Sequence, residues 1–409
     1  MRYYVYYIFF FILYTAIHYL EGLSFSGPFS FAQLWKIPVL MYLLWFCNRQ
    51  IDGKPMFESS TYWLALESFF CRETLINPIS SFVYTSKLLP FVLFTRFFYE
   101  KFKNRIDLLE KILYAFAQYI CLASLLSLLG IVKSLTNMIS AESFGVEGLQ
   151  YFSGLFGAPH AAGAYCCIAI LILFNGFIYK RFESNISKFF NFALIAVGLI
   201  SLFKSYVRTS WLMLLVGVVC FIDFHKISAR KAFSYLILLI LCITGIVFFY
   251  NNNEAFRNRI AGVNIYSNQA NEIVDLGGSG RLTFWYNGIN NWADGNIIQI
   301  LFGSGYTKVI QDNYQTTGIE VFSHNLFVDT LAQHGAIGLV LLLVIFYSLL
   351  QFILKIPNNC QYKRLCIAAY CSNVVFAFFQ GLMYFDYAIA FAIIFAVSLA
   401  HKDTYTNYK

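Results

Sequence analysis

Two arginines in otherwise apolar surroundings are the side chains best suited to bind an anion. Arg281 follows a Gly-Gly-Ser-Gly segment (277–280), which predicts that it begins a helix. A helix N-terminus and a guanidinium together make a good phosphate site, because the backbone N–H groups and the planar cation both donate to the anion. Arg208 lies in a short polar turn (204–210) between two apolar segments. Both have structural interpretations as well: Arg281 could cap its helix or pair with Asp294, and Arg208 could extend from the membrane interface to water.

Three histidines are candidates for moving a proton or lining a polar site. His324 stands in a Ser-His-Asn-Leu-Phe segment (323–327), where a long polar stretch returns to apolar sequence and Ser323 is the expected N-cap of the next helix. A neutral imidazole accepts a proton near physiological pH, so His324 is a candidate general base. A lone histidine is more often structural, and His334 has the same chemistry. His160 follows a proline suited to a helix start, so it lines a polar cavity or caps that helix, and we favour the cap.

The composition indicates what kind of protein must position these side chains. Hydrophobic residues make up 59% of the 409 residues and charged residues only 12%, about half the charged fraction of a typical soluble protein. This balance excludes a soluble enzyme, a disordered chain and a secreted disulfide scaffold. A polytopic membrane protein remains.

Apolar stretches approaching the length that crosses a bilayer recur along the chain. The expected spans are 3–20, 34–47, 57–71, 81–98, 109–132, 159–178, 189–203, 209–224, 232–250, 335–354, 365–381 and 384–400. The third is the least secure, because it is short and Glu67 interrupts it. Gly335 and Gly338 begin the tenth span and would allow close helix packing. We therefore expect an all-α polytopic membrane protein with about 12 transmembrane helices, a single membrane domain over residues 1–409.

The basic residues orient these spans. Most of the 29 lysines and arginines fall in the segments on the same side as the N-terminus, and the positive-inside rule places such segments in the cytoplasm. Both termini are therefore expected to be cytoplasmic, and Arg208 and Arg281 to lie on the outer face, against the bias. The net charge of +8 is divided among short clusters rather than gathered on one soluble face, so no nucleic-acid partner is expected.

Two outer segments, 133–158 and 251–325, are too long to be simple turns. Loops of this length are uncommon unless they are functional, so chemistry is expected on the outer face. Four apolar residues recur at helical spacing in the second segment: Leu282, Trp285, Ile289 and Trp292. This pattern predicts a partly helical loop with one helix along the membrane interface, anchored by the two tryptophans.

Other kinds of site are not indicated. The ten cysteines have no metal-site spacing and fall mostly in or beside apolar spans. The sequence has no nucleotide-binding phosphate loop and no dinucleotide fingerprint, so we expect no metal and no cofactor. Three charges are predicted inside or near the hydrocarbon, where charges face protein or water: Glu67, Lys87 and Asp386. Their role, structural or functional, stays open.

An ordered set of segments in the second half of the chain resembles the bacterial O-antigen ligase and polymerase family. They are Ser-Tyr-Val-Arg-Thr-Ser (205–210), Gly-Arg-Leu-Thr-Phe-Trp (280–285), Leu-Phe-Gly-Ser-Gly-Tyr (301–306) and the stretch from His324 to Gly338. The number of spans and the large late outer loop match that family as well. The first 150 residues match only as generic spans.

The resemblance implies a membrane glycosyltransferase of the lipid-carrier type in the bacterial inner membrane. Its donor would be a glycan on undecaprenyl pyrophosphate at the periplasmic face. Arg208 and Arg281 would bind the pyrophosphate and stabilise its charge as it leaves, and His324 would act as base on the acceptor hydroxyl. Two guanidiniums could replace a metal, because the leaving group is a good one. Three further residues are expected to bind the pyrophosphate or the glycan: Asn325, Trp285 and His160.

The acceptor distinguishes a polymerase, which uses a second lipid-linked repeat unit, from a ligase, which uses lipid A-core. An Arg-x10-Gly pattern of some polymerases is absent, since Val219 and Trp292 stand at those positions. Richness in Phe, Tyr, Ile and Asn favours a polymerase, our leading hypothesis. A glycolipid flippase is the rival of another class, but it predicts repeat-related halves that the sequence lacks. Expected partners are the lipid-linked oligosaccharide, an acceptor glycolipid, membrane lipid and, where chain length is controlled, a chain-length regulator.

Overall fold

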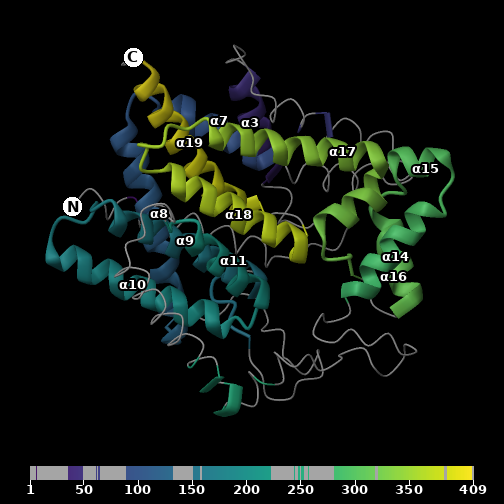
Figure 1. The fold of residues 1–409 in the computed structure, drawn as a ribbon, viewed down its shortest axis with the longest axis horizontal. Helices are drawn as coiled ribbons and strands as arrows, with labels where there is room; N and C mark the ends of the chain where they lie inside the picture. The colour runs from purple at the N-terminus through teal and green to yellow at the C-terminus, as the bar shows by residue number, and fades with distance from the viewer. Residues whose placement is uncertain are drawn as a thin grey trace.

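The computed structural model describes residues 36–48, 89–131, 151–156, 159–222, 281–317, 321–381 and 385–407, with a few isolated positions besides. Every regular element in these ranges is a helix, and they contain no strand. The helices are α3 (Lys36–Asn48), α7 (Leu89–Phe102), α8 (Ile106–Leu128), α9 (Pro159–Ile178), α10 (Asn185–Lys204), α11 (Arg208–Val219), α14 (Arg281–Ala293), α15 (Ile297–Phe302), α16 (Tyr306–Thr317), α17 (Leu326–Leu354), α18 (Lys363–Gln380) and α19 (Phe385–Asn407) (Figure 1).

The helical membrane-protein class is confirmed. Four of the described helices, α8, α9, α10 and α17, are long and apolar enough to cross a membrane, and three shorter apolar helices lie at Pro38–Cys47, Arg208–Val219 and Ala388–Lys402. The full count of spans and the placement of the termini stay predictions.

Some predictions fall on residues that the structure does not describe. Nearly all of the expected spans 3–20, 57–71 and 232–250 lies outside the described residues, as do Glu67, Lys87 and most of the loop 133–158. Asp386 lies in the first turn of α19, although its side chain is not among those described. Each of the other expected spans overlaps a described helix, and 159–178 coincides with α9.

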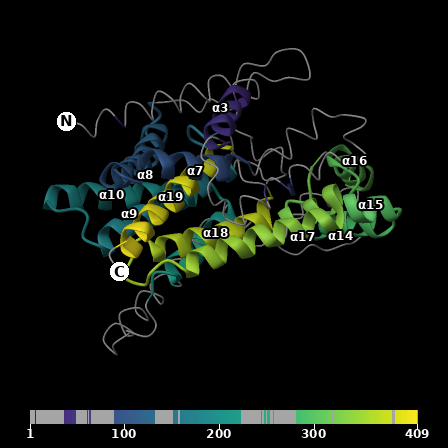
Figure 2. The same ribbon diagram turned by 90° about the horizontal axis from the view of Figure 1, so that it is seen from above.

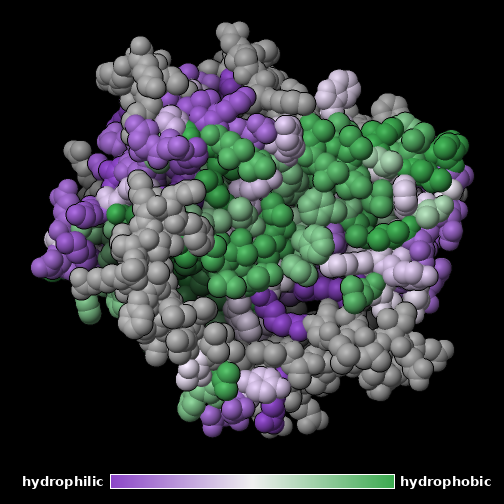
Figure 3. Space-filling view, in the orientation of Figure 1, coloured by the Kyte–Doolittle hydropathy of each residue, from purple (hydrophilic) through white to green (hydrophobic). Residues whose placement is uncertain are grey.

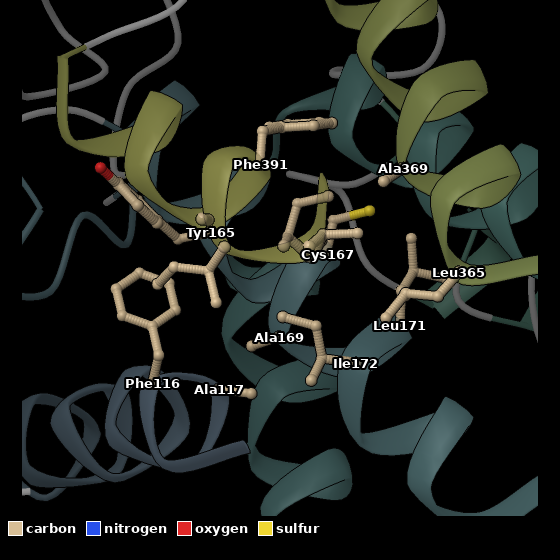
Figure 4. Close-up of a cluster of buried hydrophobic side chains, with 14 of the residues drawn as sticks. Phe116, Ala117, Tyr165, Cys167, Ala169, Leu171, Ile172, Leu365, Ala369 and Phe391 are labelled. Atoms are coloured by element: carbon tan, nitrogen blue, oxygen red, sulfur yellow. The ribbon is translucent and has the colours of Figure 1, made fainter. Parts of the chain in front are cut away.

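The helix α9 forms the centre of the bundle. It packs against α8, α10, α11, α18 and α19, and it is buried along almost its whole length. Figure 4 shows this core, where residues of α9 such as Tyr165 and Leu171 meet Phe116 of α8, Leu365 of α18 and Phe391 of α19. Small residues on α9 allow the neighbouring helices to approach closely. Such close packing stabilises helix contacts in a membrane, where the hydrophobic effect contributes little.

A second group of helices, α14, α15 and α16, lies at the opposite end of the molecule from α8 and α10 (Figures 1 and 2). These helices occupy the described part of the long segment 251–325, so the expectation that this segment is partly helical is confirmed. The helix α17 joins the two regions, since it packs against α14, α15 and α16 and also against α18.

A break in α17 makes this arrangement possible. Gly335 has φ 66° and ψ −166°, so the helix is interrupted nine residues after it begins. The carbonyls of Ala332 and Gln333 at the break accept hydrogen bonds from the backbone N–H groups of Ser304 (2.9 Å) and Gly305 (3.1 Å). The close approach predicted at Gly335 is therefore present, and its partners are the last turn of α15 and the loop that follows it.

A carboxylate ties four segments together at the N-terminal end of α18. Glu110 Oε1 of α8 accepts hydrogen bonds from Arg181 Nη2 (2.8 Å) and Gln361 Nε2 (3.3 Å), and it lies 2.7 Å from His401 Nε2 of α19. Its side chain is only 14% exposed. Because three partners from distant parts of the chain converge on it, Glu110 fixes how the helix ends are held relative to one another.

The variant Glu110→Gln is expected to destabilise the protein by about 2 kcal/mol, because it removes the largely buried charge that pairs with Arg181. Thermal unfolding of the detergent-solubilised protein measures this as a lower Tm. Asp107→Asn is the matched control: Asp107 is in the same turn of α8, pairs only with Lys111 four residues on at 3.7 Å, and is 72% exposed. A Tm equal in the two variants would contradict the role given to Glu110.

Candidate active site

The last turn of α18 is the place where the predicted site residues gather. Gln380 Nε2 donates to Thr209 Oγ1 in the first turn of α11 (3.4 Å). The ring of Trp285 in α14 packs on Phe378 and Phe379, with centroids 5.2 Å and 6.3 Å apart. A Cβ atom added at Gly381 would lie 3.5 Å from the carboxylate of Asp329 in α17. The N-terminal turns of α11, α14 and α17 therefore all contact one end of α18.

Arg208 is the first residue of α11, and the turn before it is tightly held. Ser205 Oγ donates to the carbonyl of Leu202 (2.7 Å) and accepts from the backbone N–H of Val207 (3.3 Å). Tyr206 between them has φ 51°, in the left-handed region that non-glycine residues rarely adopt. Such strained residues persist only where their surroundings hold them, and they are common at functional sites. Arg208 is half-buried directly after this turn.

Arg281 is the first residue of α14, as the glycine-rich segment before it predicted. Its helix is fastened to the His324 turn, because Trp285 Nε1 donates to the carbonyl of Ser323 (2.8 Å). Trp292 Nε1 likewise donates to the carbonyl of Ile300 (2.9 Å). These bonds correct the prediction that both tryptophans anchor α14 in the membrane interface, because both indole N–H groups are hydrogen-bonded within the protein. The apolar side chains that α14 exposes are Leu282 (55%), Tyr286 (62%) and Ile289 (44%).

His324 lies in a turn that is fixed from both sides. Its φ is 53°, again in the left-handed region. Asn325 Oδ1 accepts from the backbone N–H groups of Phe327 (2.9 Å) and Val328 (3.1 Å), so Asn325 is the N-cap of α17. The prediction that Ser323 caps this helix is wrong: its own backbone N–H instead donates to the buried carboxylate of Asp329 (2.9 Å). Both sides of the strained residue are thus hydrogen-bonded to the first turns of α17.

The positive charge of Arg281 is close enough to His324 to affect its ionisation. Burial, and after it the nearby Arg281 guanidinium, lower the pKa of His324 to about 4. At neutral pH the imidazole is therefore uncharged and can accept a proton. The hydrogen bond from Trp285 to Ser323 therefore holds a cation that can bind an anion close to a neutral base, and both side chains are partly buried.

Residues 190–343 match the model of a family described as O-antigen ligase. The resemblance to that family is thereby confirmed. The match begins in α10 and ends in α17, so it contains Arg208, Arg281 and His324. No curated protein matches the chain. The match supports a function of the O-antigen ligase and polymerase type.

Within the matched segment, the structure brings together four of the predicted site residues: Arg281, Trp285, His324 and Asn325. Asn325 is buried and its carbonyl oxygen caps α17, so its observed contacts position the turn. Arg208 approaches the same end of α18 through the contact of its neighbour Thr209. His160 is the second residue of α9, and a Cβ atom added one turn later, at Gly163, would meet the side chains of Ser205 and Ser210, so the start of α9 lies against the turn that holds Arg208.

Three contributors to the candidate site were not predicted from the sequence. Gln380 and Phe378 come from α18, which lies beyond the matched segment, and Asp329 comes from the first turn of α17. An acid in the first turn of a helix is a recognisable signal, because it complements the helix dipole. The α18 residues leave no such local signal, since their role depends on a long-range contact. Among the described residues there is no group of three His, Cys, Asp or Glu side chains that could hold a metal ion.

Proposed function

We propose that the chain is an O-antigen polymerase of the bacterial inner membrane. It transfers a glycan from undecaprenyl pyrophosphate to a sugar hydroxyl of a second lipid-linked repeat unit at the periplasmic face, with both termini in the cytoplasm. The observation that supports this best is the proximity of Arg281 to a partly buried His324, where the first turn of α14 is hydrogen-bonded to the turn before α17. Anion binding and proton acceptance are the two tasks that such a transfer requires.

In the proposed reaction the bond between C1 of the donor sugar and the pyrophosphate oxygen breaks, and a bond from C1 to the acceptor oxygen forms. The acceptor hydroxyl gives its proton to His324. Arg281 and Arg208 bind the pyrophosphate and stabilise the charge that develops as it leaves, assisted by the backbone N–H groups of the helix N-termini. Because Arg208, Arg281 and His324 are all partly buried, these electrostatic interactions are stronger than they would be in bulk water.

The low pKa of His324 fits an ordered reaction. Before the donor binds, burial and, after it, the Arg281 charge lower the pKa of His324 and make the imidazole a weak base. A bound pyrophosphate offsets that charge and raises the imidazole pKa toward its ordinary value. The base therefore becomes strong only after the donor has bound.

The apolar edge of α14 and α15 supports a location at the membrane surface. Ile297 and Ile298 of α15 are 68% and 60% exposed, and they add to the exposed apolar side chains of α14. Figure 3 shows a continuous hydrophobic surface over α17 and α18 on one face of the molecule. Insertion of this edge into the outer leaflet would hold Arg281 at the depth of the lipid phosphates.

The pH dependence of transfer is expected to show two separate acid limbs. For kcat/KM of the donor, which reports the free enzyme, the limb should lie near pH 4, the pKa of His324. For kcat, which reports the enzyme with donor bound, it should lie at higher pH, because the pyrophosphate charge raises the imidazole pKa. Steady-state rates between pH 4 and pH 8 measure both limbs, and return to neutral pH controls for irreversible loss. A kcat/KM limb near an ordinary histidine value of ~6.5 would contradict the assignment.

Deletion of the gene, followed by gel analysis of lipopolysaccharide, tests the reaction itself. A polymerase predicts that the ladder is lost while a single repeat unit remains attached to core. Core without any repeat unit, together with lipid-linked polymer, means a ligase, and would overturn the polymerase. Repeat units that accumulate on the cytoplasmic side would mean a flippase and would overturn the proposal.

A further inference from the structure

The backbone of Ser323, the residue before His324, is held from two sides. Its N–H donates to the buried carboxylate of Asp329 (2.9 Å), and its carbonyl accepts from the indole N–H of Trp285 (2.8 Å). Asp329 belongs to the first turn of α17, and Trp285 belongs to α14. Both backbone polar groups of Ser323 are therefore bonded to side chains, and the two side chains come from different helices.

The bond from Trp285 fixes the start of α14 against the turn before α17. Arg281 is four residues before Trp285, one helical turn or about 6 Å along the axis, on the same side of α14. Gly288 is almost a turn further along, and a Cβ atom added there would lie 3.1 Å from the hydroxyl of Ser323 and 2.7 Å from Val328. The helix that begins with Arg281 therefore rests directly on this turn.

The ring of Trp285 is also packed against protein. It meets Phe378 edge to face, with centroids 5.2 Å apart, and lies 6.3 Å from Phe379, both in the last turn of α18. The indole nitrogen is the single hydrogen-bonding group of a tryptophan side chain, and here it donates to Ser323. A glycan could hydrogen-bond to Trp285 only by displacing Ser323. The observed contacts therefore favour a positioning role.

The backbone of His324 is strained, so the residue before it has to be held. Its φ is 53°, and a residue in the left-handed region keeps that conformation only where its surroundings fix it. Asn325 caps α17 on the far side of His324, and the two bonds to Ser323 hold the near side. Without those bonds the turn would relax, and the imidazole would move relative to Arg281.

We propose that Trp285 and Asp329 are positioning residues that form a clamp on the backbone of Ser323 and thereby fix the imidazole of His324 beside Arg281. Trp285 sets the position of the turn relative to α14, and Asp329 sets it relative to α17. The proposal rests on the function proposed above, since this spacing affects transfer only where His324 is the base and Arg281 binds the leaving group.

The kinetic test compares Trp285→Phe with Trp292→Phe in the purified full-length protein. Trp292 is the matched control, because its indole N–H also donates to a backbone carbonyl, that of Ile300, at 2.9 Å. Trp285→Phe is expected to lower kcat about tenfold, the effect of one lost buried hydrogen bond, with both KM values unchanged. Trp292→Phe should keep the wild-type kcat.

Two results of this comparison would overturn the clamp. A raised KM with an unchanged kcat in Trp285→Phe would mean that the side chain binds the glycan. An equal kcat in the two variants, whether lowered or not, would mean that the bond to Ser323 has no special part in positioning the base.

Asp329 is tested by a pair of its own variants. Asp329→Asn keeps an oxygen that can accept from the N–H of Ser323, whereas Asp329→Leu removes the acceptor at a similar volume. Asp329→Leu is expected to lower kcat at least about tenfold, and Asp329→Asn to recover most of that loss. Asp329→Asn decides the role even where Asp329→Leu fails to fold. A loss in Asp329→Asn of more than about tenfold would contradict the clamp, because the hydrogen bond is kept.

A titration that needs no glycan transfer separates the clamp from the proposed function. NMR follows labelled histidine rings in the detergent-solubilised protein, and His324→Asn identifies the signal of His324. Burial, and after it Arg281, lower the pKa of His324 to about 4 in the wild type. In Trp285→Phe the turn moves away from Arg281, so this pKa should rise toward its ordinary value of ~6.5, while Trp292→Phe keeps the wild-type value. The carboxylate of Asp329, bonded to the same turn, is present in both variants.

The titration and the transfer assay together give distinct outcomes. A raised His324 pKa in Trp285→Phe alone, in a protein that transfers no glycan, would support the clamp and contradict the proposed function. Transfer by the wild type, with the same His324 pKa in the wild type and both tryptophan variants, would overturn the clamp alone.

Discussion

Replacing Arg281 by alanine is expected to lower the rate of glycan transfer at least 100-fold, the order of loss seen when one group that stabilises transition-state charge is removed. The guanidinium stands at the N-terminus of α14, where the helix dipole adds to its attraction for the pyrophosphate. Arg281→Lys should recover only part of the rate, because an ammonium keeps the charge but lacks the planar fork that binds two phosphate oxygens. Assay of the purified protein with a lipid-linked donor measures both variants.

Arg281→Ala is also expected to change the pH dependence of transfer, which the loss of a purely structural arginine would leave unchanged. Arg281 lowers the pKa of His324, so in Arg281→Ala the acid limb of kcat/KM should move above pH 4 in the residual activity. Arg257→Ala is the matched control, since Arg257 is an exposed arginine of the same long segment, and its activity should equal that of the wild type. An unchanged acid limb in Arg281→Ala would show that the two side chains do not interact.

A test of His324 needs a variant that removes the imidazole without straining the backbone. Because its φ is 53°, alanine would introduce strain as well as remove the base. Asparagine tolerates the left-handed region and has no proton-accepting ring, so His324→Asn is the cleaner test. We expect it to fold normally and to lose activity 100-fold or more. Normal transfer by His324→Asn would exclude His324 as the base.

The helices and the first residues of the site could be predicted from the sequence, because both leave local signals. The apolar run at 159–178 coincides with α9, and the glycine-rich segment correctly placed Arg281 at a helix start. By contrast, α17 begins at Leu326 and not at Gly335. Its first nine residues include the polar side chains Asp329, Gln333 and His334. A span predicted from a continuous apolar run therefore includes only the part of α17 that follows the break at Gly335.

The contacts that assemble the site could not be predicted, because they join residues far apart in the chain. Helical spacing placed Trp285 on a stripe but could not show that its partners are Ser323 and two phenylalanines of α18. Similarly, both Ser323 and Asn325 are good N-cap residues. The choice between them depends on Asp329, which binds the backbone of Ser323 and leaves the cap to Asn325.

Gly335→Ala is expected to destabilise the protein by about 4 kcal/mol or more, well beyond the loss expected for Glu110→Gln. The backbone at φ 66° and ψ −166° is accessible essentially only to glycine. In addition, the new methyl group would meet the backbone of Leu301 and lie 2.6 Å from the backbone nitrogen of Gly303. A backbone cannot move aside as a flexible side chain can, so the loop after α15 would separate from α17. Thermal unfolding and the yield of folded protein measure the effect.

Gly130→Ala isolates the steric part of this loss. Gly130 also has a positive φ, 71°, but a Cβ atom there would have no heavy atom within 4 Å. It should therefore lose only about 1–2 kcal/mol from backbone strain. Gly303→Ala acts on the other side of the same crossing, so the double variant with Gly335→Ala should cost less than the sum of the two single losses. Equal stability of Gly335→Ala and Gly130→Ala would mean that the crossing is not tight. If instead the crossing fails as expected, the first half of α17 loses its anchor, and with it the position of His324 beside Arg281.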